Sequence, residues 1–151
     1  MKALFLGLGG IGQRHLRNLL ALEPDAHIGA VRHIKRKFEI TPELSADASV
    51  DIEKKYGIRC FPNLNTAIQK FDPDFAVVAT PSNTHASITL ILSKANIPVL
   101  LEKPISHTQD NLDDIMNTVV DTGLPVMIGY MLRFHPAVQK LRSLVRKRTL
   151  G

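Results

Sequence analysis

Three glycines near the start of the chain have a spacing that could serve a phosphate group. Gly7, Gly9 and Gly12 form the pattern Gly-x-Gly-x-x-Gly, directly after an apolar run and before a leucine-rich one. The first glycine allows a sharp exit from a strand, the second lets backbone approach a pyrophosphate, and the third permits close packing of a helix on the sheet. Because a helix N-terminus offers free N–H groups to an anion, Gly7, Gly9, Gly10, Ile11 and Gly12 are predicted to bind a dinucleotide cofactor. A glycine-rich turn without a ligand is the alternative.

The residue expected to meet the ribose of that cofactor is basic. An enzyme selective for NAD usually places an acid about 20 residues after the last glycine, and Arg32 stands at that position. The sequence from 27 to 38 holds no Asp or Glu and reads Arg-His-Ile-Lys-Arg-Lys at 32–37. Because a guanidinium can grip a 2′-phosphate with two hydrogen bonds, Arg32 favours NADP over NAD. A solvated basic loop is the alternative.

A second polar segment follows the continuous apolar run 75–79, where hydroxyl and amide groups would lie at a helix N-terminus near the cofactor. The predicted cofactor-binding residues of this segment are Thr80, Pro81, Asn83 and His85. Plain capping of the helix by Ser82 or Asn83 needs no ligand and is the alternative.

A charged pair follows the apolar run 97–101. Glu102 and Lys103 come directly after this run, and Pro104 fixes the turn. Both are predicted to lie against the cofactor, and a lysine there can hydrogen-bond a substrate hydroxyl or carbonyl and help to move its proton. A surface ion pair at a strand end is the alternative.

A last polar segment follows the run 125–129. Its Arg133 and His135 are predicted to bind a polar substrate, and the alternative is a helix entry with one structural arginine.

Alternating apolar strands and helices must position these segments. Strands are predicted at 2–6, 27–31, 58–61, 75–79, 97–101 and 125–129. Helices are predicted at 10–22, 52–56, from Asn63 or Asn65 to 71, from Ser82 or Asn83 to 96, from Thr108 to 123, and from Pro136 onwards. Residues 32–44 are predicted to form a loop, and 45–47 to cap the helix that follows. The alternation predicts an α/β doubly wound parallel sheet, the Rossmann fold, with strand order 3-2-1-4-5-6 and helices on both faces. In this fold ligands bind beyond the carboxyl ends of the strands.

Length and composition limit the classes of function that the chain can have. The chain of 151 residues is enough for one domain, residues 1–151, with 44% hydrophobic and 22% charged residues. The single cysteine excludes an intrachain disulfide and a cysteine-based metal site, so we expect a cytoplasmic protein without a metal. No segment is long enough to span a membrane. The net charge of +5 comes without tryptophan or a helix-turn-helix pattern, which disfavours a nucleic-acid partner.

The polar segments together resemble the cofactor domain of the glucose–fructose oxidoreductase/inositol dehydrogenase family. The matching residues are 7–12 with His15, 79–85, 102–104 and 129–136, in the order of the family. The resemblance implies a nicotinamide-dependent oxidoreductase that acts on sugars, polyols or related cyclic substrates by hydride transfer. It assigns Lys103 the role of the catalytic lysine and places Glu102, Pro104 and residues 80–85 against the cofactor. Members commonly form dimers or tetramers.

The chain departs from this family in two respects. Arg32 stands where many members have an acid, which leaves the choice of NAD or NADP open. Members also continue into a second, mostly antiparallel domain that supplies substrate walls and the oligomer interface, whereas this chain stops at Gly151. We therefore expect a truncated domain that is weakly active or inactive alone, with a homo-oligomer or a partner chain supplying the rest. A non-catalytic dinucleotide-binding sensor or regulatory module is the alternative.

Overall fold

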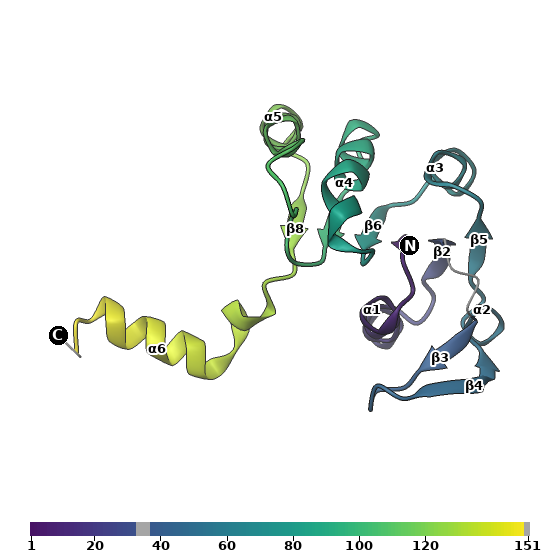
Figure 1. Cartoon of the computed structure of the whole chain (residues 1–151), viewed down its shortest axis with the longest axis horizontal. Coiled ribbons are helices and arrows are strands. Elements are labelled where there is room, and N and C mark those ends of the chain that lie inside the picture. Colours follow the sequence, from purple (N-terminus) through teal and green to yellow (C-terminus); the bar gives the residue numbers. More distant parts are fainter. Residues whose placement is uncertain (33–36, 150–151) are drawn as a thin grey trace.

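Six short apolar segments pair side by side into one parallel sheet (Figure 1). The computed structural model describes residues 1–32 and 37–149. The strands of the sheet are β1 (Lys2–Leu6), β2 (His27–Val31), β5 (Arg59–Phe61), β6 (Phe75–Val78), β7 (Val99–Leu101) and β8 (Val126–Ile128). Their order across the sheet is β5-β2-β1-β6-β7-β8. When only these six are numbered along the chain, this is the predicted order 3-2-1-4-5-6, and the predicted fold is confirmed.

Helices cover both faces of the sheet. The helices are α1 (Gly10–Leu22), α2 (Ile52–Lys55), α3 (Leu64–Phe71), α4 (His85–Lys94), α5 (Leu112–Thr122) and α6 (Pro136–Arg146). Ala3 and Phe5 of β1 point into the cluster that contains α1 and α2, whereas Leu4 and Leu6 point into the cluster with α3 and α4. This burial on both faces explains why the strands read as continuous apolar runs.

The chain leaves the sheet after β8. A short 3₁₀ turn, Met131–Phe134, leads into α6, which projects away from the sheet (Figure 1). Pro136 is the first residue of α6 as predicted, and the His135 side chain caps the helix by accepting the Ala137 N–H. Among the described residues, no helix combines the length and hydropathy needed to cross a membrane.

The segment predicted as a loop contains a strand. β3 (Phe38–Ile40) pairs antiparallel with β4 (Ala46–Asp51) in a separate hairpin, so residues 45–47 do not cap α2. The cap is Asp51, whose carboxylate accepts the N–H groups of Glu53 and Lys54. Residues 33–36, part of the same predicted loop, lie outside the described part of the chain.

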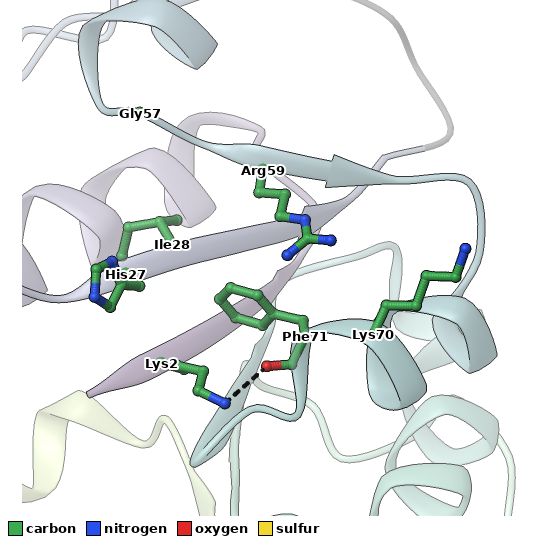
Figure 2. A pocket seen from close by; sticks show the side chains of 7 residues that line it. All are labelled: Lys2, His27, Ile28, Gly57, Arg59, Lys70 and Phe71. Carbon is green, nitrogen blue, oxygen red and sulfur yellow. Dashed lines mark hydrogen bonds between the residues drawn. The ribbon is translucent and has the colours of Figure 1, made fainter.

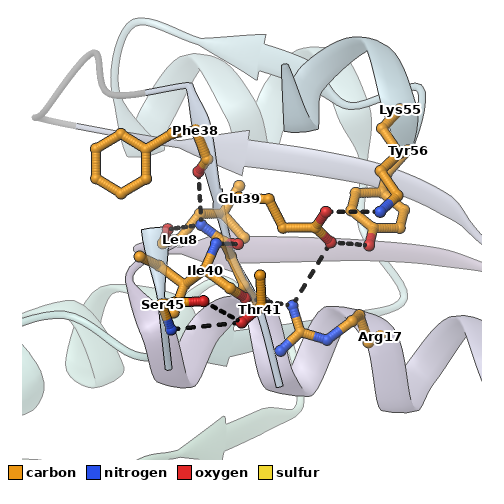
Figure 3. A network of polar contacts seen from close by, with 10 residues as sticks. Leu8, Arg17, Phe38, Glu39, Ile40, Thr41, Ser45, Lys55 and Tyr56 are labelled. Carbon is orange, nitrogen blue, oxygen red and sulfur yellow. Dashed lines mark hydrogen bonds and ion pairs between the residues drawn. The ribbon is translucent and has the colours of Figure 1, made fainter. Parts of the chain in front are cut away.

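Partly buried polar contacts hold this hairpin on the body of the domain. The Glu39 carboxylate lies 2.6 Å from Lys55 Nζ, 2.7 Å from Tyr56 Oη and 3.9 Å from the Arg17 guanidinium. Figure 3 shows these three partners around it. Arg17 also donates to the Ile40 carbonyl at 2.8 Å. Polar partners from α1, from α2 and from Tyr56 after α2 therefore hold the hairpin.

The other helix boundaries agree with the prediction in part. Asn63 caps α3 by accepting the Thr66 N–H, and Gly123 ends α5 with φ 66°. The cap predicted at Thr108 is wrong, because α5 starts after Asn111 and the Thr108 hydroxyl donates to Asp110 instead. Capping by Ser82 or Asn83 is also wrong in the described structure, because a 3₁₀ turn, Ser82–Thr84, precedes α4 and carries no side-chain cap.

Candidate cofactor-binding site

The glycine turn, which connects β1 to α1, is tightly packed at two of its three glycines. Gly7 has φ 91°, a conformation that favours glycine, and a Cβ there would lie 2.6 Å from the Ala79 carbonyl oxygen. A Cβ at Gly12 would overlap the Gly7 carbonyl. A Cβ at Gly9 would meet nothing within 4 Å among the described residues. Packing therefore requires glycine at two of the three positions, and the third leaves open space in front of the helix.

That open space faces the N-terminus of α1. Gly9 is the cap residue, and within the described structure no side chain caps the helix there. The first intrahelical bond runs from the Gln13 N–H to the Gly9 carbonyl at 2.9 Å, so the N–H groups of Gly10, Ile11 and Gly12 precede the helical ladder. These donors and the positive end of the helix dipole suit a pyrophosphate, so the residues present fit a dinucleotide.

Gln13, which belongs to no predicted site, holds the turn in place. Its side chain is 2% exposed, and its amide nitrogen donates to the carbonyls of Leu8 at 3.1 Å and Phe38 at 3.2 Å. Its oxygen accepts the Ile40 N–H at 2.6 Å. Gln13 thus ties the turn to β3, a contact that no sequence motif indicates.

The register of the parallel strands brings the predicted segments to one edge. Leu6 pairs with Val31 and Val78, Val78 pairs with Leu101, and Leu101 pairs with Ile128. The next residues along these strands form one row at the carboxyl end of the sheet, and they are Gly7, Arg32, Ala79, Glu102 and Gly129. The glycine turn and the segments at 80–85 and 102–104 therefore begin side by side.

Glu102 is held by a residue of α1. Its Oε1 lies 2.7 Å from His15 Nε2, and its Oε2 accepts the Lys103 N–H at 3.2 Å. A Cβ at Gly129 would lie 3.5 Å from Oε1, an ordinary van der Waals contact, so the carboxylate does not require glycine at this position. The Lys103 side chain is exposed at the same edge. The arrangement orients the start of the Glu-Lys-Pro segment and leaves the lysine accessible.

His85 lies beneath the edge and joins two of its segments. The side chain is 1% exposed, with Nδ1 2.7 Å from the Pro104 carbonyl and Nε2 2.8 Å from the Thr80 carbonyl. The geometry makes His85 a tie between the 80–85 and 102–104 segments. Thr80, Pro81 and Asn83 are more accessible than His85.

Arg32 forms an ion pair with Glu53, an acid that lies outside the position expected about 20 residues after the glycine motif. Its guanidinium lies 2.8 Å from Glu53 Oε1, and Lys37 Nζ lies 2.8 Å from Glu53 Oε2. The hydrogen bond from Lys37 lowers the pKa of Glu53, and burial opposes it. Glu53 comes from α2, 21 residues after Arg32 in sequence. The predicted ribose-binding position therefore holds an ion pair.

Arg133 and His135 lie apart from the row of strand ends, in the exposed segment that leads to α6. The His135 side chain caps α6. The substrate contacts predicted for His135 and Arg133 stay predictions. Among the described residues, no group of three His, Cys, Asp or Glu side chains is placed to hold a metal ion.

A hollow at the opposite edge of the sheet is separate from this site. Figure 2 shows it between Lys2, His27, Arg59 and Phe71, with Lys2 Nζ donating to the Phe71 carbonyl at 3.1 Å. Lys2 and His27 are the first residues of β1 and β2. In this fold the cofactor binds at the carboxyl ends of the strands, so the hollow is not the expected site.

Known proteins similar to this chain include several dehydrogenases. The chain is 24% identical over 143 residues to UDP-N-acetylglucosamine 3-dehydrogenase of Acidithiobacillus ferrooxidans, and 26% identical over 147 residues to inositol 2-dehydrogenase of Corynebacterium glutamicum. These alignments cover 95% and 97% of this chain but 41% of each relative. The chain therefore spans about two fifths of the length of these relatives.

Solved structures and a family model agree on the domain. Scyllo-inositol dehydrogenase from Lactobacillus casei, solved with bound NAD(H) and scyllo-inositol, superposes with a TM-score of 0.77 at 21% identity, covering 100% of this chain and 42% of that one. At this identity the likeness shows the fold. The model of the Gfo/Idh/MocA oxidoreductase family, described as an NAD-binding Rossmann fold, matches residues 1–130. With most of its length matched, a confirmed strand order and the glycine turn in place, the chain belongs to the Gfo/Idh/MocA oxidoreductase family.

Proposed function

We propose that this chain is the dinucleotide-binding domain of an oxidoreductase that moves a hydride between a nicotinamide ring and a sugar, polyol or related cyclic substrate. The observation that carries the proposal is the row of strand ends, which brings the open N-terminus of α1 and the Glu102–Lys103 pair to one edge. A bound nicotinamide supplies the hydride chemistry, and the protein supplies binding, orientation and proton handling.

Each segment has a distinct task in this proposal. The N–H groups of Gly10, Ile11 and Gly12 bind the pyrophosphate, with Gly7 and Gly9 shaping the turn. Lys103 hydrogen-bonds the reacting hydroxyl or carbonyl of the substrate and holds or releases its proton. Glu102, oriented by His15, positions the backbone at Lys103.

The segments around the lysine have supporting tasks. Thr80, Pro81 and Asn83 form the wall of the cofactor site, and His85 fixes this wall to Pro104. Arg133 and His135 stay the predicted contacts for a small polar substrate.

The choice of cofactor depends on Arg32. Taken alone, a guanidinium at the end of β2 favours NADP, whereas its contact with Glu53 at 2.8 Å argues against a free phosphate-binding arginine. NAD or NADP fits the remainder of the edge.

The whole protein needs more than this domain. Since the relatives are more than twice as long, we propose that a further domain, a partner chain or a second copy completes the substrate side. A cytoplasmic location and the absence of nucleic-acid and membrane partners remain predictions.

Binding is the direct test. Binding can be followed by the fluorescence of the reduced nicotinamide of NADH or NADPH, which is excited at wavelengths where protein side chains do not absorb. We expect the wild-type chain to bind a reduced dinucleotide through the N–H groups at the start of α1. If the folded wild-type chain binds neither dinucleotide, the proposal is wrong.

A further inference from the structure

The ion pair at the end of β2 occupies the position that discriminates between the two dinucleotides. Arg32 directly follows Val31, the last residue of β2, in the row where a Rossmann domain meets the ribose of its cofactor. Its side chain is 9% exposed, and that of Glu53 is 21% exposed. With 2.8 Å between NH1 and Oε1, this is a charge-assisted hydrogen bond that is partly shielded from water.

A second cation and a second carboxylate complete the cluster. Lys37 Nζ lies 2.8 Å from Glu53 Oε2 and 3.8 Å from Asp51 Oδ2. Glu53 therefore uses one oxygen for each cation. Asp51 caps α2 and fixes the position of Glu53 by accepting its N–H at 2.9 Å. In the described part of this cluster, two carboxylates match two cations, and the basic character that the sequence indicates at Arg32 and Lys37 is largely neutralised.

We propose that Glu53 sets the choice between NAD and NADP by holding Arg32 and Lys37 in ion pairs. Glu53, which lies on α2, would then take the role of the acid that NAD-selective enzymes usually carry at the end of β2. This inference rests on the proposed function, since it requires a dinucleotide at this edge. A 2′-phosphate must displace an existing Arg–carboxylate bond and approach a negative group. A 2′-hydroxyl meets neither obstacle, and a carboxylate can accept its hydrogen bond.

The charge states support this role. Hydrogen bonding to Lys37 holds the pKa of Glu53 below its ordinary value, and the same bond raises the pKa of Lys37. Both groups therefore stay charged across the neutral range in which dinucleotide binding is measured.

The test compares Glu53→Gln with Glu43→Gln in titrations with NADH and NADPH at fixed ionic strength. Glu43 is an exposed acid in the β3–β4 turn, so its variant removes the same charge away from the cluster. We expect Glu53→Gln to raise the affinity for NADPH relative to NADH by about ten-fold or more, the effect of one freed charged hydrogen bond. Glu43→Gln should leave the ratio unchanged. Adding Arg32→Ala to Glu53→Gln should erase the gain.

Arg32→Ala in the wild-type background is a second test that does not depend on the Glu53 variant folding. If Glu53 withholds the guanidinium, this variant loses little NADPH affinity relative to NADH. A selective loss of about ten-fold or more would mean that the phosphate reaches Arg32, and the inference would be overturned. An unchanged ratio in a folded Glu53→Gln chain would overturn it as well. Both results can be obtained only if the wild-type chain binds a dinucleotide. A wild-type chain that binds neither NADH nor NADPH is a different outcome, and it would refute the proposed function together with this inference.

Discussion

Alanine at Gly9 and at Gly12 should separate cofactor binding from folding within one turn. A Cβ at Gly12 would overlap the carbonyl of Gly7, a backbone group that no side-chain rotation can move, and would also lie 3.6 Å from the Ala79 Cβ. A Cβ at Gly9 would point into open space among the described residues, and the backbone φ of −72° suits alanine. The two variants therefore make the same chemical change with opposite structural consequences.

The expected magnitudes follow from these surroundings. Overpacking costs about 1–3 kcal/mol, and a clash with backbone places Gly12→Ala at about 3 kcal/mol. For a domain of this size that lowers Tm by about 6–12 °C. Gly9→Ala should change stability by less than about 1 kcal/mol, because no protein atom must move. It should weaken NADH binding about 10–100-fold, since the Cβ occupies the approach to the pyrophosphate and disrupts a charged hydrogen bond.

Thermal melts and NADH titrations on the same preparations check both halves. We expect Gly9→Ala to melt like the wild-type chain and to bind poorly, and Gly12→Ala to melt well below it. A Gly9→Ala chain that binds NADH with wild-type affinity would refute the assignment of the open space to the pyrophosphate. Equal destabilisation by both variants would refute the reading of the turn geometry.

Three other perturbations have defined outcomes. The hydrogen bond from Lys55 holds the pKa of Glu39 below its ordinary 4.5. The contact therefore stabilises the fold above pH 4.5, and this stabilisation is lost as the pH falls through the lowered pKa. Urea unfolding should show Glu39→Gln about 1–2 kcal/mol less stable than the wild-type chain at pH 7, with a smaller difference at lower pH. His15→Ala removes the partner of the Glu102 carboxylate at 2.7 Å and should cost about 1–3 kcal/mol in the same assay, whereas no cost would mean that solvent replaces the imidazole. Partial burial raises the pKa of the Cys60 thiol, although the residue as a whole is exposed. Mass spectrometry should therefore show slower alkylation of Cys60 by iodoacetamide at pH 8 than of free cysteine. An equal rate would contradict the raised pKa.

Much of the architecture could be predicted from the sequence because its signals are local. The six apolar runs, the glycine turn, Asn63 as a helix cap, Pro136 at a helix start and Gly123 at a helix end each act within a few residues. The strand order follows from the alternation of strand and helix together with the glycine turn, since this combination is typical of one topology.

The β3–β4 hairpin could not be read in the same way. Its residues are largely polar. The two strands are stabilised by Gln13 from α1, by Lys55 from α2 and by Tyr56, which directly follows α2. Only the folded chain brings these partners to Glu39 and Ile40. The predicted loop was therefore wrong where the strand depends on distant polar contacts.

The same distinction between local signals and distant contacts applies to the candidate site. The segments that follow the strands, including the glycine turn and the Glu102–Lys103 pair, could be predicted from the order of residues along the chain. The tertiary structure alone decided their partners, because His15 and Glu102 are 87 residues apart and Arg32 and Glu53 are 21 apart. Such pairs are set by strand register and helix placement, which no spacing along the chain encodes. An arginine that indicates NADP in the sequence thus becomes, beside Glu53, part of an ion pair.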